Sequence, residues 1–160
     1  MISPFLKKLL FARQFSMVGG KIDILGKKQV LLPADIIFDL GKIDPKAAYK
    51  SVKQAMQKDM VDYARKLGST DEGMLNVISE LFETFGLGSM EIVDLDNKRR
   101  RCIIRIHSQP SMDGKDNKDE GTITSAALSG VFSFLFKKDV NPKKVSAGIR
   151  GTNYDEYVVS

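Results

Sequence analysis

The sequence predicts an α+β protein in which hairpins build a mostly antiparallel sheet and several helices pack against it. Two features support this class: apolar residues recur at helical spacing in long segments, and short apolar runs occur in pairs around polar or glycine-containing turns. Because short turns join consecutive strands in antiparallel pairs, the paired runs favour hairpins over a parallel sheet. The 160 residues, 42% of them hydrophobic, are expected to form a single domain over 1–160.

The first forty residues predict a helix, a hairpin and a second helix. Residues 1–15 carry an apolar patch beside basic residues, so we expect a helix that packs on the protein or forms a dimer; attachment to a membrane surface is the less favoured alternative. Strands are expected at 21–25 and 29–32, separated by a turn that contains a glycine. A helix over 34–40 follows, and Gly41 is expected to end it.

Helical periodicity is strongest in the middle of the chain. Asp44 and Pro45 form a start signal, and apolar residues then recur every three or four positions up to Leu67. Ser69 and Glu72 fit a capping box, which begins another helix with an apolar stripe. These two helices are expected to supply the helical side of the core.

The second half of the chain predicts two hairpins with a helix between them. The expected strand pairs are 90–95 with 101–106 and 145–150 with 154–159. Residues 108–121 are polar and rich in aspartate, lysine and glycine, so a mobile loop is expected there. Thr122 or Thr124 is then expected to cap a helix that runs to Phe136.

Composition argues against several classes of protein. No segment approaches the roughly 20 uninterrupted apolar residues that a membrane-spanning helix needs, so no membrane span is expected. The single cysteine, Cys102, lies in an apolar strand pattern and is interpreted as a small buried residue instead of a nucleophile. The absence of an internal disulfide agrees with a cytoplasmic location.

The net charge of +5 raises the question of a nucleic-acid partner. Basic and acidic residues are interspersed almost everywhere, and the one dense basic cluster, Lys98 to Arg101, follows Asp94 and Asp96 at an expected hairpin turn. A solvated turn is therefore favoured over a phosphate-binding patch, and no nucleic-acid partner is expected.

The sequence contains no recognisable catalytic constellation. Gly86 and Gly88 lie between a helix and a strand, the reverse of the order that cradles phosphate. The sole histidine, His107, has no second histidine or nearby cysteine with which to form a metal site, so a surface or loop-packing role is favoured over a catalytic one. We expect no cofactor, and we do not expect an enzyme.

Methionine and phenylalanine recur on the inner faces of three predicted helices. Flexible methionines beside aromatic rings are able to line an adaptable cavity for a small apolar ligand. The expected cavity-lining residues are Met56, Met60, Phe82, Phe85, Phe132 and Phe136. The competing interpretation is that these side chains only fill a core, and the residues alone do not decide between the two.

Four short segments, together with the terminal hairpin, carry a resemblance to a known family. They are Glu83-Thr84-Phe85-Gly86 at a helix end, Ser89-Met90-Glu91-Ile92-Val93-Asp94-Leu95 in a hairpin, Ser129-Gly130-Val131-Phe132 in a helix of small residues, and Leu31-Leu32-Pro33-Ala34 at a strand-to-helix junction. From Met74 onward the order of these elements resembles that of the vinyl-4-reductase domain family, also called hydrocarbon-binding proteins, and the junction at Leu31–Ala34 agrees with the family's layout in the N-terminal half. The resemblance implies the fold shared with haem-type nitric-oxide sensors and TRAPP vesicle-tethering subunits, and frequent dimers.

The resemblance also bears on metal. Members of the family that sense aromatic compounds hold zinc through a glutamate and cysteines. Alignment by spacing puts Ser125, Ser146, Ile149 and Tyr157 at those positions, with Asn153 where a glycine is usual. None of these residues offers a thiolate, so the resemblance implies that zinc is absent here.

Three functions follow from these observations and are kept open. The first is a non-catalytic, homodimeric sensor or carrier domain that binds a small hydrophobic or aromatic ligand in an internal cavity. The second is a protein–protein interaction or scaffold module similar to TRAPP subunits. The third is an accessory protein in tetrapyrrole or hydrocarbon reduction, for which the sequence contains no cofactor motif.

Overall fold

The computed structural model has an α+β fold of five helices and two antiparallel sheets among the residues it describes, so the predicted class is confirmed. The described ranges are 3–67, 71–108, 121–146 and 154–160. The chain forms two compact units, Met1–Pro33 and Ala34–Ser160. The expectation of a single domain over 1–160 stays a prediction. No helix among the described residues is long and apolar enough to cross a membrane.

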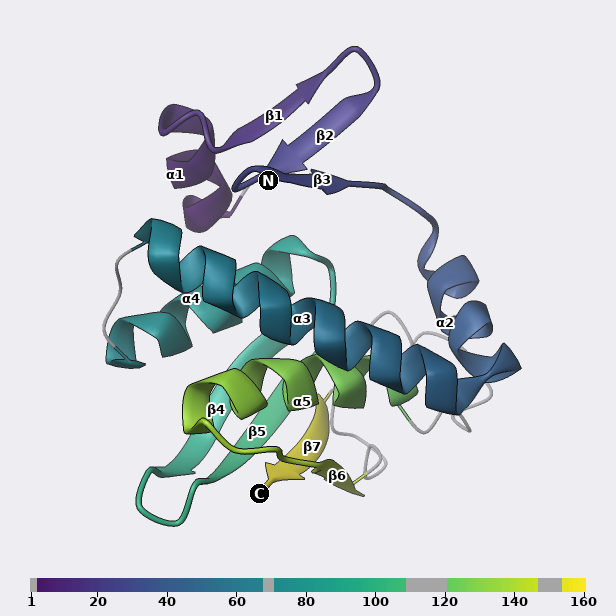
Figure 1. The fold of residues 1–160 in the computed structure, drawn as a ribbon, viewed down its shortest axis with the longest axis vertical. Coiled ribbons are helices and arrows are strands. Elements are labelled where there is room, and N and C mark those ends of the chain that lie inside the picture. Colours follow the sequence, from purple (N-terminus) through teal and green to yellow (C-terminus); the bar gives the residue numbers. More distant parts are fainter. Residues whose placement is uncertain (1–2, 68–70, 109–120, 147–153) are drawn as a thin grey trace. The chain divides into compact units, whose positions relative to one another are not determined.

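The smaller unit consists of helix α1 (Pro4–Phe11) and a three-stranded antiparallel sheet in the order β1-β2-β3 (Figure 1). Its strands are β1 (Phe15–Val18), β2 (Lys21–Ile24) and β3 (Lys27–Gln29). The Ser3 hydroxyl caps α1 by accepting a hydrogen bond from the Leu6 N–H at 3.2 Å.

Two of our predictions for this unit were wrong. The helix expected over 1–15 ends at Phe11, because the chain turns at Arg13, where φ is +56°, and Phe15 then pairs with Ile24 in a strand that we did not predict. The strand expected at 29–32 lies earlier, at Lys27–Gln29.

The larger unit contains the other helices and the second sheet. The helices are α2 (Ala34–Ile43), α3 (Pro45–Leu67), α4 (Asp71–Thr84) and α5 (Thr122–Phe136). Gly41 does not end α2, as we had expected, because it lies in the helix with no positive φ and packs against Ile123 of α5. The predicted extent of α3, from Pro45 to Leu67, is confirmed.

The second sheet has the order β4-β5-β7-β6, with every neighbouring pair antiparallel. Its strands are β4 (Ser89–Asp96), β5 (Arg101–His107), β6 (Pro142–Ser146) and β7 (Tyr154–Val159). The predicted β4–β5 hairpin is confirmed. The predicted pairing of the last two strands is confirmed by β6 and β7, although β6 begins at Pro142, earlier than the expected 145, and residues 147–150 lie outside the described ranges. We did not predict that β7 also pairs with β5 and therefore lies inside the sheet.

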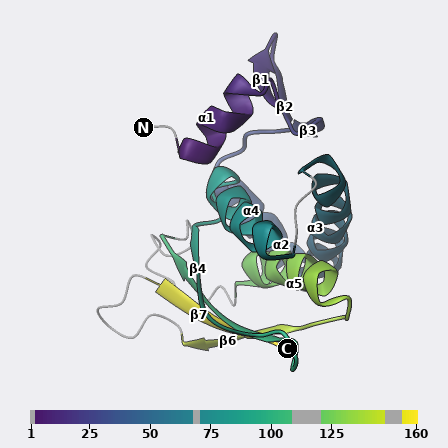
Figure 2. The ribbon, with the colours of Figure 1, turned by 90° about the vertical axis from the view of Figure 1, so that its left-hand side faces the viewer.

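Helix α5 lies between α3 and the sheet (Figure 2). Twelve of its fifteen residues are buried, which explains why its sequence contains no charged residue. The sheet turns one face toward α5: along β5, Cys102, Ile104 and Ile106 are fully buried and the residues between them are not. The core of the unit is thus layered around α5.

The start of α5 differs from the expected one. Its N-cap is Gly121, in a left-handed conformation with no side-chain capping bond, instead of Thr122 or Thr124. Thr124 is buried inside the helix. Two further expectations, the cap at Ser69 and the mobility of the loop, fall on residues outside the described ranges.

Candidate functional site

The six predicted cavity-lining residues come from α3, α4, the turn directly after α4, and α5, and most of them are buried. Met60, Phe82 and Phe132 have no exposed surface, and Phe136 is 6% exposed. Met56 and Phe85 are half-buried. The rings of Phe132 and Phe136 lie 5.6 Å apart and are tilted by 52°. Neither of the pockets described below is lined by any of the six, so their role in ligand binding stays a prediction.

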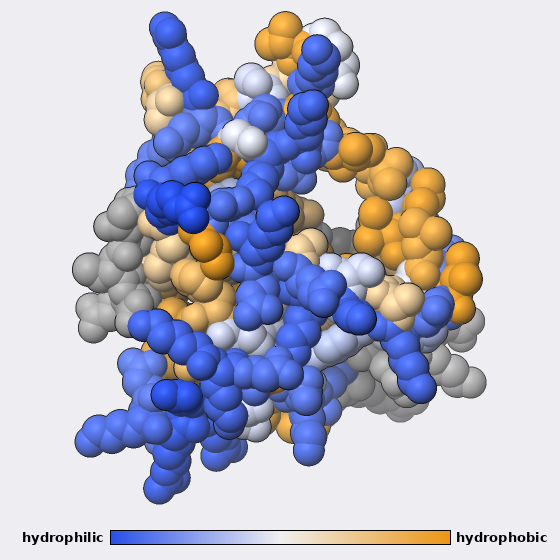
Figure 3. All heavy atoms as spheres, in the orientation of Figure 1, coloured by the Kyte–Doolittle hydropathy of each residue, from blue (hydrophilic) through white to orange (hydrophobic). Residues whose placement is uncertain are grey.

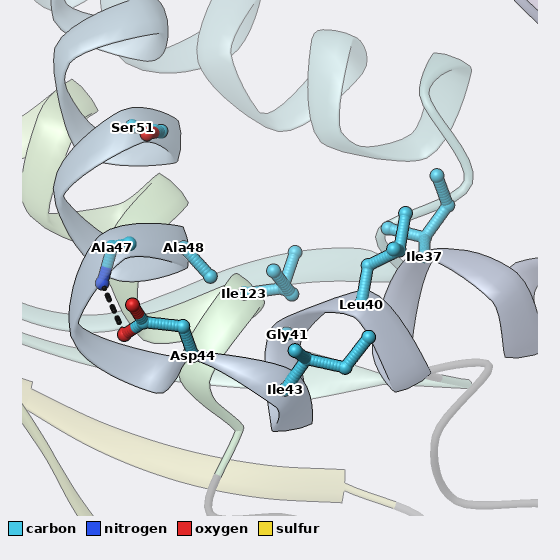
Figure 4. A pocket seen from close by; sticks show the side chains of 9 residues that line it. All are labelled: Ile37, Leu40, Gly41, Ile43, Asp44, Ala47, Ala48, Ser51 and Ile123. Atoms are coloured by element: carbon cyan, nitrogen blue, oxygen red, sulfur yellow. Dashed lines mark hydrogen bonds between the residues drawn. The ribbon is translucent and has the colours of Figure 1, made fainter.

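An apolar pocket lies instead at the junction of α2, α3 and α5 (Figure 4). Its volume is about 350 Å³, and it is open to solvent on one side. Nine residues line it: Ile37, Leu40, Gly41, Ile43, Asp44, Ala47, Ala48, Ser51 and Ile123. The site therefore combines a wall of branched aliphatic side chains on α2 with small side chains on the first turns of α3.

The local sequence explains why space remains there. Asp44 begins α3: one of its carboxylate oxygens accepts a hydrogen bond from the Ala47 N–H at 3.0 Å, and its carbonyl oxygen accepts one from the Ala48 N–H at 2.9 Å. Ala47, Ala48 and Ser51 follow on one face of the helix, where they are too short to reach α2.

The floor of the pocket is a tight contact between two helices. An ideal Cβ on Gly41 would lie 3.1 Å from the Cδ1 atom of Ile123, so only glycine lets α2 approach α5 this closely without moving that side chain. The Gly41–Ile123 contact thereby fixes one side of the pocket.

Large apolar residues, from which we predicted the cavity, do not reveal this pocket. The signal that was present is the opposite one, a run of small residues (Ala47, Ala48, Ser51) at helical spacing beside the isoleucine-rich segment 36–43. Small residues on one helix opposite branched residues on another leave either a close contact or a hollow, and the sequence does not say which.

A second, more polar pocket of about 430 Å³ lies at the end of α5. It is lined by Gln57, Ser133, Phe134, Lys137, Lys138 and Asp139. Lys53 forms an ion pair with Asp139, and its hydrogen bond holds the pKa of that carboxyl below its usual value. The Ser133 hydroxyl accepts a hydrogen bond from the Val140 N–H at 3.2 Å, which fixes the chain as it leaves the helix.

The reactive side chains of the sheet do not assemble into a catalytic site. Burial, followed by the nearby charge of Asp94, raises the pKa of the Cys102 thiol to about 12, so this cysteine is a poor nucleophile. His107 lies on the other face of the sheet, 2.9 Å from a carboxylate oxygen of Glu91. Arg105, next to it, donates a hydrogen bond to Glu156 at 2.9 Å, which raises the pKa of the guanidinium.

Two of the residues aligned with the zinc ligands of the resembling family lie close together. An ideal Cβ on Gly121 would lie 2.7 Å from the Tyr157 hydroxyl and 3.9 Å from the Ser125 hydroxyl. Both groups are neutral hydroxyls, which are not the thiolate, imidazole or carboxylate ligands that zinc takes, so these residues do not fit the metal. Of the other aligned residues, Ile149 and Asn153 lie outside the described ranges. No group of three metal-binding side chains occurs among the residues that the structure describes.

Comparison with known proteins places the fold in the class that the resemblance implied. No protein-family model and no curated protein sequence matches the chain. Among solved structures, the phenol-responsive sensory domain of the transcription activator PoxR, determined with phenol, is similar over 99% of this chain and 90% of its own, with a TM-score of 0.65 and 13% identity.

Two further structures have the same fold. A vinyl-4-reductase family protein from Methanocaldococcus jannaschii has a TM-score of 0.52 and 15% identity over 82% of this chain and 83% of its own. A trafficking protein particle complex subunit 3 from Naegleria fowleri, covalently bound to palmitic acid, has a TM-score of 0.51 and 11% identity over 78% of this chain and 87% of its own. The predicted resemblance is thus confirmed for the fold.

Proposed function

We propose that this chain is a binding domain for a small apolar ligand and that the pocket between α2, α3 and α5 holds it. The observation that carries the proposal is the pocket itself, an apolar hollow of about 350 Å³ with one polar edge. Its volume falls in the range of small-molecule sites, which are usually apolar with few polar groups. The fold is compatible with this role, since the similar PoxR sensory domain was solved with phenol.

The pocket's chemistry favours binding over catalysis. Seven of its nine lining residues are aliphatic residues or glycine from α2, α5 and the first turn of α3, and no cysteine, lysine or histidine lies among the described residues that line it. Burying an apolar ligand against this wall releases about 25 cal/mol for each Å² removed from water. A single aromatic ring or a short branched chain suits the available space.

Filling the pocket tests the proposal. In Ala48→Leu, a larger side chain enters the pocket from α3, whereas Ala55→Leu makes the same change at an exposed position of the same helix outside it. We expect phenol and toluene to raise the melting temperature of the wild type and of Ala55→Leu but not that of Ala48→Leu, because a ligand stabilises only the state that binds it. Absence of any shift in the wild type would overturn the proposal.

The same experiment decides between two places for the ligand. The residues predicted from the sequence, among them Met60 and Phe132, offer a second place inside the core. A shift that persists in Ala48→Leu would move the ligand from the pocket to that set.

A second candidate function is a protein–protein interaction module, and one surface feature favours it. Ile36, Leu40 and Ile43 of α2 are 45%, 56% and 80% exposed, and apolar residues are visible over this helix in Figure 3. Exposed apolar residues grouped on one helix are typical of interaction sites. If α2 binds a second copy, Ile36→Glu, which lies outside the pocket, will convert a dimer to a monomer in light-scattering measurements while ligand binding continues.

A further inference from the structure

We infer that the pocket between α2, α3 and α5 selects apolar ligands that carry a positively charged head group, with Asp44 as the residue that recognises this group. The inference rests on the proposed function and goes one step beyond it, because it names the class of ligand. It depends on the position of Asp44, the one hydrogen bond that its carboxylate accepts, and the absence of a positively charged residue among the described residues that line the pocket.

Asp44 presents a free carboxylate oxygen at the edge of the pocket. Its Oδ1 atom accepts the hydrogen bond from the Ala47 N–H, the dashed line in Figure 4. Within the described part of the chain, no hydrogen bond or ion pair reaches its Oδ2 atom. Because the hydrogen bond from Ala47 engages only the first oxygen, the second is available to a ligand.

The rest of the pocket offers a path for the apolar part of such a ligand. Ala48 and Ser51 follow Asp44 on the same face of α3, and seven residues of a helix span roughly 10 Å. Ile37 and Leu40 face this stripe from α2. If the ring of a ligand packs against these side chains, its polar substituent is able to reach the carboxylate of Asp44.

The local charge of the pocket has the opposite sign to the net charge of the chain. Asp44 is the only charged residue among the described residues that line the pocket. The chain as a whole carries a net charge of +5, which at long range favours anions over cations. A preference for cations must therefore arise locally, at the pocket.

Four probes of similar shape test the inference: benzylamine, which is cationic at neutral pH, benzyl alcohol, toluene and benzoate. Because Asp44 is solvent-exposed, its attraction for a cation is that of a surface ion pair, and we expect benzylamine to bind about two- to five-fold more tightly than toluene at low salt. Benzoate should bind most weakly. The preference should fall as sodium chloride screens the charge.

Asp44→Asn removes the charge and keeps the cap, since asparagine is as good an N-cap as aspartate. In this variant the affinity for benzylamine should fall to that for toluene, with the melting temperature of the free protein unchanged. Asp35→Asn is the matched control, because Asp35 is an exposed aspartate of α2 outside the pocket. It should keep the preference.

The outcomes separate the two proposals. Equal binding of all four probes to the wild type, or a preference that Asp35→Asn removes as fully as Asp44→Asn does, would overturn the role of Asp44 and leave the proposed function standing. Failure of every probe to bind would overturn both.

Discussion

The backbone of α3 passes so close to Gly130 of α5 that an ideal Cβ on this glycine would lie 2.5 Å from the carbonyl oxygen of Lys53. The same atom would lie 2.8 Å from the Cβ of Met56. The two helices approach this closely because Gly130 has no side chain, as in other helix crossings built on small residues. Because Lys53 contributes backbone here, the obstacle has no rotamer with which to move aside.

Gly130→Ala should therefore destabilise the protein. Overpacking of a close contact costs about 1–3 kcal/mol, which outweighs the gain of up to about 1 kcal/mol from alanine's higher helix propensity. Urea unfolding measures the difference. Gly41→Ala is the comparison, because its obstacle is the flexible end of Ile123 at 3.1 Å. A loss at Gly41 equal to that at Gly130 would show that the backbone contact is not the cause.

Phe132→Ala tests the packing of the core. Phe132 has no exposed surface and packs against the tilted ring of Phe136, so we expect its truncation to lower the free energy of unfolding by about 3–5 kcal/mol. Phe134 lies on the same helix but is only half-buried, so Phe134→Ala should lower the free energy of unfolding by less. A loss at Phe132 no larger than that at Phe134 would indicate a hollow already present beside it, as the sequence-predicted ligand set requires.

Cys102 should be inert to thiol reagents in the native protein. Burial raises its pKa to about 12, so almost no thiolate is present at pH 8, and the side chain is inaccessible. We expect Ellman's reagent to label no cysteine under native conditions and one per chain in guanidinium chloride. Rapid labelling of the folded protein would contradict the buried position of β5.

The protein should bind no zinc. Ser125 and Tyr157 offer only hydroxyl groups at two of the positions that our resemblance-based alignment assigns to zinc ligands, so we expect no stoichiometric zinc by elemental analysis. Because structural zinc contributes on the order of 10 kcal/mol where it is present, a chelator should leave the melting temperature unchanged. Tightly held zinc would overturn our alignment of β7 with the family's ligand positions.

The ion pair between Lys53 and Asp139 should give a small pH-dependent stability. The hydrogen bond from Lys53 lowers the pKa of Asp139 in the folded state, so its contribution is present above the ordinary aspartate pKa of about 4 and is lost as the pH falls through the folded value. Lys53→Met should reduce stability at pH 7 by less than about 1 kcal/mol, since Asp139 is largely exposed.

This difference should remain constant between pH 7 and about pH 5 and shrink below about pH 4. Lys138→Met is the control, because no ion pair of Lys138 occurs among the described residues. A deficit in Lys53→Met that persists unchanged at pH 2 would show that the lost packing of the lysine, and not its charge, is responsible.

The elements predicted correctly are those whose signal is local. The long helix α3 has a start signal at Pro45 and an uninterrupted apolar stripe, and the β4–β5 hairpin has a polar turn between two apolar runs. Each of these patterns is complete within a few residues, so its interpretation did not depend on the rest of the chain.

The elements predicted incorrectly depend on distant residues. Gly41 was expected to end a helix, but Ile123 of α5 packs on it and the helix continues. The pairing of β7 with β5 is invisible in either strand alone. The pocket was missed for the same reason: whether small residues such as Ala48 produce a contact or a hollow depends on where the neighbouring helix lies.

The position of β7 has a consequence for how the protein folds and opens. Arg105 on β5 and Glu156 on β7 are bonded neighbours although they are 51 residues apart in sequence. Closing so long a loop costs entropy before any pairing is gained, so the sheet should form later than α3, whose contacts are local. Among the described strands, β6 lies at the edge with β7 as its only partner, whereas β7 also pairs with β5, so β6 should lose amide protection before β7 in native-state hydrogen exchange.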